Sequence, residues 1–121
     1  MKTILVVDDE FANAEVLALI LAEEGYSVTC ASNGRDALGK IEQSCPDLVI
    51  VDYMMPIMDG GALGHAIRAH AQWRQTKIVM QSSLSEAAVQ PRWDGYDAFV
   101  RKPYNVDALL RIIEQLLGRP Q

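Results

Sequence analysis

The sequence predicts an α/β fold with a five-stranded parallel sheet and helices on both of its faces. Three short runs, at 4–7, 48–51 and 78–80, are continuously apolar, which is typical of strands buried on both faces of a parallel sheet. Segments with helical periodicity separate these runs, and such alternation predicts a parallel sheet covered on each side. The 121 residues are enough for one domain with its own hydrophobic core.

The first part of the chain contains two strand–helix units. The run at 4–7 ends in three acidic residues, and the helix that follows is predicted to end at Gly25. Its buried stripe is predicted to consist of Val16, Leu17, Ile20 and Leu21. Residues 26–30 alternate between apolar and polar, which predicts a less buried edge strand. Ser32-Asn33-Gly34 then forms the turn and cap of a second, short helix.

The third unit contains the most apolar strand of the chain. The run at 48–51 ends at Asp52, and a proline four residues later stops the strand. A glycine-containing loop around Asp59 then leads into a third helix. The next buried strand, at 78–80, leaves the core through the polar residues Gln81, Ser82 and Ser83.

The last third of the chain is the least regular. Residues 85–89 can form only a turn or two before Pro91 interrupts them, so the fourth helix is predicted to be short or irregular. Residues 98–100 form a short strand, and Lys102 follows it after one intervening residue. The final helix shows the clearest i, i+3, i+4, i+7 period, and two residues mark its end, Gly118 and Pro120.

Composition excludes several classes of protein. The net charge of −5 argues against a nucleic-acid surface. No apolar run approaches the ~20 residues that span a bilayer, and the first residues do not form a signal peptide. Cys30 and Cys45 make no disulfide framework, so both are expected to be reduced in a cytoplasmic chain. The two tryptophans, Trp73 and Trp93, stand in or near loops and are expected to be partly buried.

Reactive side chains follow four of the predicted strands. Right-handed crossovers bring the carboxyl ends of all the strands to one edge of the sheet, so five side chains should converge there: Asp8, Asp9, Asp52, Ser82 and Lys102. Three carboxylates repel one another unless a cation lies between them, and Mg²⁺ suits carboxylates that share a site with phosphate. A lysine and a hydroxyl add partners for anionic oxygens. These groups suit phosphoryl transfer, with Asp52 as the best nucleophile.

Together these residues resemble the receiver domain of two-component response regulators. The match rests on the Asp8-Asp9 pair, on Asp52 with the following Met55-Pro56 and Asp59-Gly60, on Ser82-Ser83, and on Lys102-Pro103. The resemblance covers residues 1–121 as a single receiver domain with no effector domain. It implies a flavodoxin-like, doubly wound sheet with strand order 2-1-3-4-5, in which the first and third strands are neighbours.

The resemblance also implies a role for each residue of the site. Asp52 accepts a phosphoryl group from a histidine kinase or a histidine phosphotransfer protein, and an unidentified downstream partner senses the change. Mg²⁺ is held by Asp9, Asp52 and the backbone carbonyl of Met54, with Asp8 acting through water. Lys102 contacts the phosphoryl group, Ser82 moves towards it and Phe99 repacks as an aromatic switch. Ser83 is the alternative to Ser82, because both hydroxyls leave the same strand.

Two other functional classes remain to be compared. A hydrolase of the haloacid dehalogenase kind needs an acid two residues after the nucleophile, where this chain has Met54. A flavodoxin-like redox protein needs a phosphate-binding loop after the first strand, where this chain has acidic residues. These residues argue against both classes.

Met54 and Leu84, which stand two residues after Asp52 and Ser82, are bulky and apolar. They are expected to hinder water and to make self-dephosphorylation slow.

Overall fold

The structure, a computed structural model, describes residues 1–119. Pro120, one of the two residues predicted to end the last helix, lies outside the described residues. The strands are β1 (Thr3–Val7), β2 (Ser27–Ala31), β3 (Leu48–Asp52), β4 (Lys77–Ser82) and β5 (Ala98–Arg101). The helices are α1 (Phe11–Glu23), α2 (Gly34–Ser44), α3 (Gly60–Ala69), the 3₁₀ turn η1 (Ala71–Trp73), α4 (Glu86–Val89) and α5 (Val106–Leu117). Within this described part, no helix is long and apolar enough to span a bilayer.

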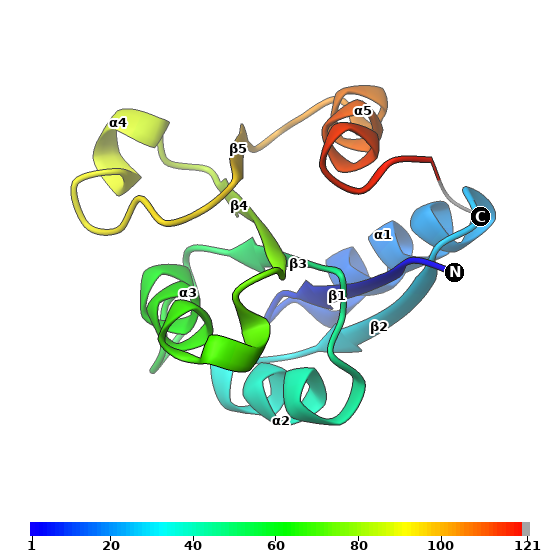
Figure 1. Cartoon of the computed structure of the whole chain (residues 1–121). Helices are drawn as coiled ribbons and strands as arrows, with labels where there is room; N and C mark the ends of the chain where they lie inside the picture. The colour runs from blue at the N-terminus through cyan, green and yellow to red at the C-terminus, as the bar shows by residue number, and fades with distance from the viewer. Residues whose placement is uncertain (120–121) are drawn as a thin grey trace.

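The five strands form one parallel sheet in the order β2-β1-β3-β4-β5. This is the predicted order, and it makes β1 and β3 direct neighbours in the middle of the sheet (Figure 1). Their register pairs Val7 with Val51, so the residues that follow these two positions leave the sheet side by side. The topology therefore brings the acidic residues of two separate loops to one edge.

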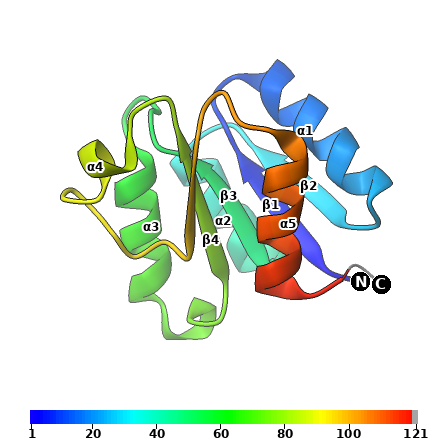
Figure 2. The ribbon, with the colours of Figure 1, turned by 90° about the horizontal axis from the view of Figure 1, so that it is seen from above.

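Helices cover both faces of the sheet, as the apolar runs predicted. Figures 1 and 2 show α1 and α5 on one face and α2 and α3 on the other. Side chains alternate along each strand, and two core clusters result. The first contains Leu5, Val49 and Ile78 and packs against α2 and α3. The second contains alternate strand residues, such as Ile50 and Val79, and packs against α1 and α5.

The buried stripe of α1 differs from the predicted one. Leu17 and Leu21 are buried as expected, but Val16 is 58% exposed and Ala14 takes its place in the core. The helix carries apolar residues around most of its circumference, so several stripes fit the helical period equally well. Packing against β1 and β2 selects one of them, and the exposed Val16 remains at the protein surface.

The α4 helix is short, as predicted. It extends only from Glu86 to Val89, with the Ser85 side chain accepting a hydrogen bond from the Ala88 amide. Val89 alone on this helix is buried, in the first core cluster. A helix of one turn with one buried side chain cannot hold its own position, so the following segment must be fixed by other contacts.

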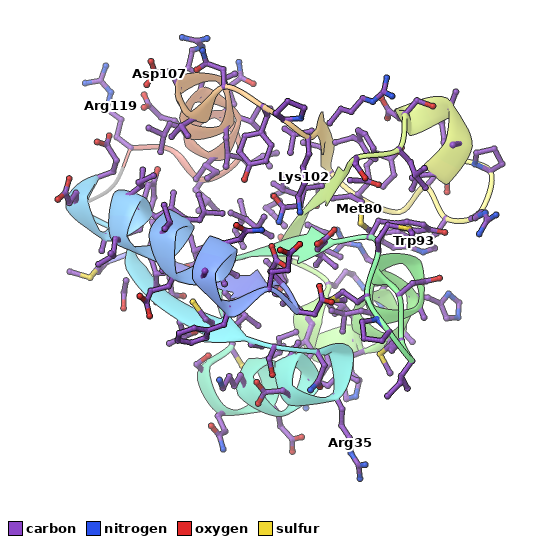
Figure 3. The ribbon with its side chains drawn as sticks, turned by 180° about the vertical axis from the view of Figure 1, so that it is seen from behind. Arg35, Met80, Trp93, Lys102, Asp107 and Arg119 are labelled. Carbon is purple, nitrogen blue, oxygen red and sulfur yellow. The ribbon has the colours of Figure 1, made fainter. Side chains whose placement is uncertain are left out.

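The aromatic residue that fixes this segment is Trp93. Its indole lies against α3 (Figure 3), where a Cβ atom added at Gly64 would collide with the ring. Gly95 in the loop leaves space for the same ring, and Gly61 on the same helix faces the Trp93 Cβ atom. The expected partial burial is therefore correct for Trp93, whereas Trp73 is almost fully buried, with only 4% exposed.

Substitution of Gly64 tests this contact. We expect Gly64→Ala to lower the free energy of unfolding by about 1–3 kcal/mol, the usual cost of overpacking, because the methyl group would occupy the position of the Trp93 ring. Urea unfolding measures the change. Gly39→Ala in α2 is the matched control, since nothing lies within 4 Å of the added atom, and it should stabilise by about 0.5–1 kcal/mol. Equal effects of the two substitutions would contradict the assignment.

Candidate functional site

Three carboxylates converge at the carboxyl ends of β1 and β3. Asp8 and Asp9 follow β1 directly, and Asp52 is the last residue of β3. One oxygen of each lies within 4.8 Å of the others. Asp8 and Asp52 are buried, with 3% and 5% exposed, whereas Asp9 is open to solvent. The sheet thus holds two buried acids in contact with an exposed one, at the position that the sequence predicted.

Lys102 supplies the positive charge of this site. It follows β5, and its backbone amide donates a hydrogen bond of 2.7 Å to the Ser82 carbonyl. The side-chain Nζ lies 3.1 Å from Asp52 Oδ2 and 3.8 Å from Asp8 Oδ2. Figure 3 shows Lys102 at the centre of the molecule, beside the ends of the strands. One ammonium group is therefore shared by the two buried carboxylates.

The environment of Asp52 disfavours its charged form. Burial raises the pKa of the Asp52 carboxyl, and the negative charge of Asp8 raises it further. The hydrogen bond and charge of Lys102 act in the opposite direction, as does the Met54 amide, which donates to Asp52 Oδ1 at 3.4 Å. The net direction is upward, so one lysine does not fully compensate the acids. A bound cation would relieve the remaining repulsion.

The two candidate switch residues lie close to this cluster but not in it. Ser82 is fully buried at the end of β4, and its Oγ accepts a hydrogen bond of 3.0 Å from the Leu84 amide. Ser83, the alternative hydroxyl, is exposed. Phe99 on β5 is half-buried against the first core cluster, and its ring centroid lies 5.7 Å from that of Tyr96. Among the described residues, no hydrogen bond joins Ser82 to Asp52.

The loop after β3 passes very close to the site. A Cβ atom at Gly60 would lie 2.7 Å from the Tyr53 Cα and 2.9 Å from the Asp52 carbonyl oxygen, so only glycine fits there. The Gly60 amide donates to the Tyr53 carbonyl at 2.8 Å, which closes the loop. Met54 within this loop is 56% exposed, and Leu84 in the next loop is 38% exposed. Both apolar side chains are therefore exposed, and their backbone amides donate to Asp52 and Ser82 respectively.

Sequence reasoning missed one further side chain at this edge. Gln81 is paired in register with Asp52 and is only 2% exposed. Its Oε1 accepts a hydrogen bond of 2.9 Å from the hydroxyl of Tyr104, two residues beyond Lys102. The signal was present in the sequence, because an amide directly after a buried apolar run needs a hydrogen-bonding partner.

Comparison with known proteins agrees with this geometry. The profile of the response regulator receiver domain matches residues 4–114. The chain belongs to the response regulator receiver family. Among curated relatives it is similar to the probable transcriptional regulatory protein TcrX of Mycobacterium tuberculosis, with 30% identity over 117 residues, which cover 97% of this chain and 50% of TcrX. The receiver chain spans about half the length of the first curated relatives that it matches.

Solved receiver structures superpose along nearly the whole chain. The response regulator TrrA of Thermotoga maritima, crystallised in complex with Mg²⁺-BeF, is 37% identical, with a TM-score of 0.87 that covers 97% of this chain and 100% of TrrA. The signal receiver domain of a histidine kinase from Syntrophus aciditrophicus is 33% identical, with a TM-score of 0.90 and coverage of 98% and 91%. The predicted receiver fold is confirmed.

The raised pKa of Asp52 gives a prediction about stability. A raised pKa means that the ionised carboxylate opposes folding, and this cost disappears below the unfolded value near 3.8. We therefore expect Asp52→Asn to stabilise the metal-free protein at pH 7, with the gain vanishing as the pH falls below that value. Denaturant unfolding in EDTA across this range measures it.

Asp59→Asn is the matched control for this substitution. The Asp59 side chain caps α3 by accepting a hydrogen bond from the Ala62 amide, and asparagine caps a helix equally well. This control should change stability by no more than a few tenths of a kcal/mol at either pH. A loss of stability in Asp52→Asn at neutral pH would show that the buried carboxylate is fully compensated.

Proposed function

We propose that this receiver domain is a phosphorylation-dependent signalling switch whose phosphoryl acceptor is Asp52. The donor is a histidine kinase or a histidine phosphotransfer protein. The observation that carries the proposal is the position of Asp52, which is buried beside Asp8 and has the Lys102 ammonium 3.1 Å from its Oδ2. A carboxylate with a cation beside it can accept a phosphoryl group without leaving the new charge uncompensated.

The transfer step exchanges one bond to phosphorus for another. An Asp52 oxygen attacks the phosphorus atom, the bond between phosphorus and the donor imidazole nitrogen breaks, and the nitrogen keeps the electron pair. An acyl phosphate results on Asp52. Lys102 is within reach of the oxygens that carry the transferred charge, because its Nζ already contacts the attacking carboxylate. Its role is to stabilise that charge in the transition state.

The acidic cluster also fits Mg²⁺. Carboxylate oxygens from Asp8, Asp9 and Asp52 lie within 4.8 Å of one another, and hard oxygen ligands are those that Mg²⁺ prefers. We assign direct contacts to Asp9, Asp52 and the Met54 carbonyl, with Asp8 acting through water. When bound, the ion neutralises charge on the acids and on the phosphoryl oxygens. The complex of the similar protein TrrA with Mg²⁺-BeF supports this assignment.

The change at Asp52 has to reach the protein surface. Ser82 and Phe99 are the proposed switch, because Ser82 lies at the end of the strand next to β3 and Phe99 packs against the first core cluster on the neighbouring strand β5. A phosphoryl group offers the Ser82 hydroxyl a new acceptor, which shifts an existing equilibrium between two conformations.

The 121 residues act here as one receiver domain that signals through protein contacts. The net charge of −5 disfavours nucleic acid as the direct partner.

Labelling with acetyl phosphate tests the acceptor. We expect the protein to gain the mass of one phosphoryl group in the presence of Mg²⁺, and Asp52→Asn to gain none, because an amide is not a nucleophile for this reaction. Intact-protein mass spectrometry measures the gain. Removal of Mg²⁺ with EDTA should reduce labelling to the background.

Three further variants distinguish the acceptor from its neighbours. Asp59→Asn keeps all three acids of the cluster and should be labelled like the wild type. Ser82→Ala and Ser83→Ala should both still be labelled, but only the first should lose the conformational response, because Ser83 is exposed. Equal labelling of wild type and Asp52→Asn would refute the acceptor assignment.

We propose that two apolar side chains set the lifetime of the phosphorylated state. Met54 and Leu84 stand two residues after Asp52 and Ser82, and both side chains are bulky, apolar and exposed. We propose that they obstruct water and that self-dephosphorylation is slow. The double substitution Met54→Ala and Leu84→Ala should accelerate phosphate loss by about tenfold, or about 1.4 kcal/mol of barrier. Time courses after donor removal measure the rate, and an unchanged or slower loss would contradict the obstruction.

A further inference from the structure

Gln81 is an unusual residue for its position. It lies in β4 directly after the buried apolar residues Ile78, Val79 and Met80, and it is itself only 2% exposed. The proposed chemistry gives it no task. A buried amide costs free energy unless it is hydrogen-bonded, so a valine or leucine would satisfy the core at lower cost. The hydrogen bond that Gln81 makes is therefore the feature to explain.

The side chain of Gln81 faces the same side of the sheet as the reactive carboxylates. Asp52 and Gln81 are partners in the register of β3 and β4, and side chains of paired residues project to the same face. Gln81, Asp8 and Lys102 line one groove of about 500 Å³ between α1 and α5. The amide therefore lies next to the phosphorylation site, on the side that α1 and α5 flank.

The partner of Gln81 belongs to the segment that carries the reactive lysine. Tyr104 lies two residues after Lys102, and its hydroxyl donates to Gln81 Oε1 at 2.9 Å. On the other side, the Lys102 amide is held by the Ser82 carbonyl at 2.7 Å. Residues 102–104 are thus attached to β4 at both ends, once through the main chain and once through the tyrosine ring.

Packing holds the Tyr104 ring on one side only. The ring packs against the second core cluster, but it also lines the groove of about 500 Å³ and is only partly buried, so there is open space into which it can turn. Two acids also lie near this ring. Burial raises the pKa of the Tyr104 hydroxyl, and the negative charges of Asp8 and Asp52 raise it further. The hydrogen bond to Gln81 is the interaction that selects one orientation beside these acids.

We propose that Gln81 is a positioning residue for phosphoryl transfer: by holding the Tyr104 hydroxyl, it fixes the segment from which Lys102 reaches Asp52. The proposal rests on the proposed function. Lys102 carries its charge on a flexible four-carbon stem that is 27% exposed. The hydrogen bond limits the positions from which this stem can start. It acts through Lys102 and does not touch the reacting atoms.

Two conservative substitutions remove the bond from either side. Tyr104→Phe deletes only the hydroxyl, and Gln81→Met replaces the amide with an apolar side chain of similar length. Each should slow labelling of Asp52 by acetyl phosphate about three- to tenfold at saturating donor and Mg²⁺, less than the roughly hundredfold that a misplacement of about 1 Å can cause. The double variant should be no slower than the slower single one, because both remove the same interaction.

The measurements also exclude a purely structural role. The donor concentration at half-maximal rate and the Mg²⁺ affinity should stay unchanged, because the acids themselves are not moved. Tyr96→Phe is the matched control: it deletes a hydroxyl bonded at 2.8 Å to Glu86, away from the acidic cluster. It should lose a comparable hydrogen bond and keep the wild-type rate.

The possible results separate this proposal from the proposed function. If the wild type is not labelled, the assignment of Asp52 as the acceptor fails. If the wild type is labelled and both Tyr104→Phe and Gln81→Met react at its rate, the positioning role alone is refuted. Additive losses in the double variant, or a loss in Tyr96→Phe of the same size, would also overturn it. NMR of the Lys102 ammonium gives an independent readout, since its signal should broaden or shift in both variants.

Discussion

The pairing of β1 with β3 is the constraint on which the rest of the site depends. It places Asp8 and Asp52 side by side at the edge of the sheet, and both carboxylates have almost no solvent exposure. Lys102 reaches both of them, but burial still raises the pKa of Asp52. The fold therefore maintains a local excess of negative charge. Buried ionisable groups with shifted pKa values are typical of functional sites, and this cluster offers binding positions for a cation and a phosphoryl group.

The sequence predicted this part of the molecule because its causes are local. A continuous apolar run is sufficient to define a buried parallel strand, and the residue that follows it must lie at the edge of the sheet. The positions of Asp52 and Lys102 follow from that rule alone. The order of the strands is not local, and it came from the family resemblance together with the handedness of crossovers.

Other features depended on packing between distant segments. Val16 fits the helical period of α1 as well as Ala14 does, and only contact with the sheet decides which one is buried. The site of Trp93 requires glycines at two positions of α3 and one in its own loop, so no single stretch of sequence reveals it. The bond between Gln81 and Tyr104 joins residues 23 positions apart. Its sequence signal is one amide in an apolar strand, which indicates that a partner exists but not which residue it is.

The pleat of β4 places the two proposed roles, positioning and switching, on opposite faces of the sheet. Gln81 and Ser82 are consecutive, so their side chains project to opposite sides. Gln81 faces the groove with Lys102 and Tyr104, whereas Ser82 lies on the side where Phe99 packs against the first core cluster. On that second side, Phe99, Tyr96 and Trp93 form a row of aromatic contacts that reaches α3, with ring centroids 5.7 and 6.1 Å apart. Because α4 is only one turn long, this row provides most of the aromatic packing between β5 and α3 on that side. In the proposed switch, the residue that positions Lys102 and the hydroxyl that responds to the phosphoryl group are therefore consecutive residues of one strand.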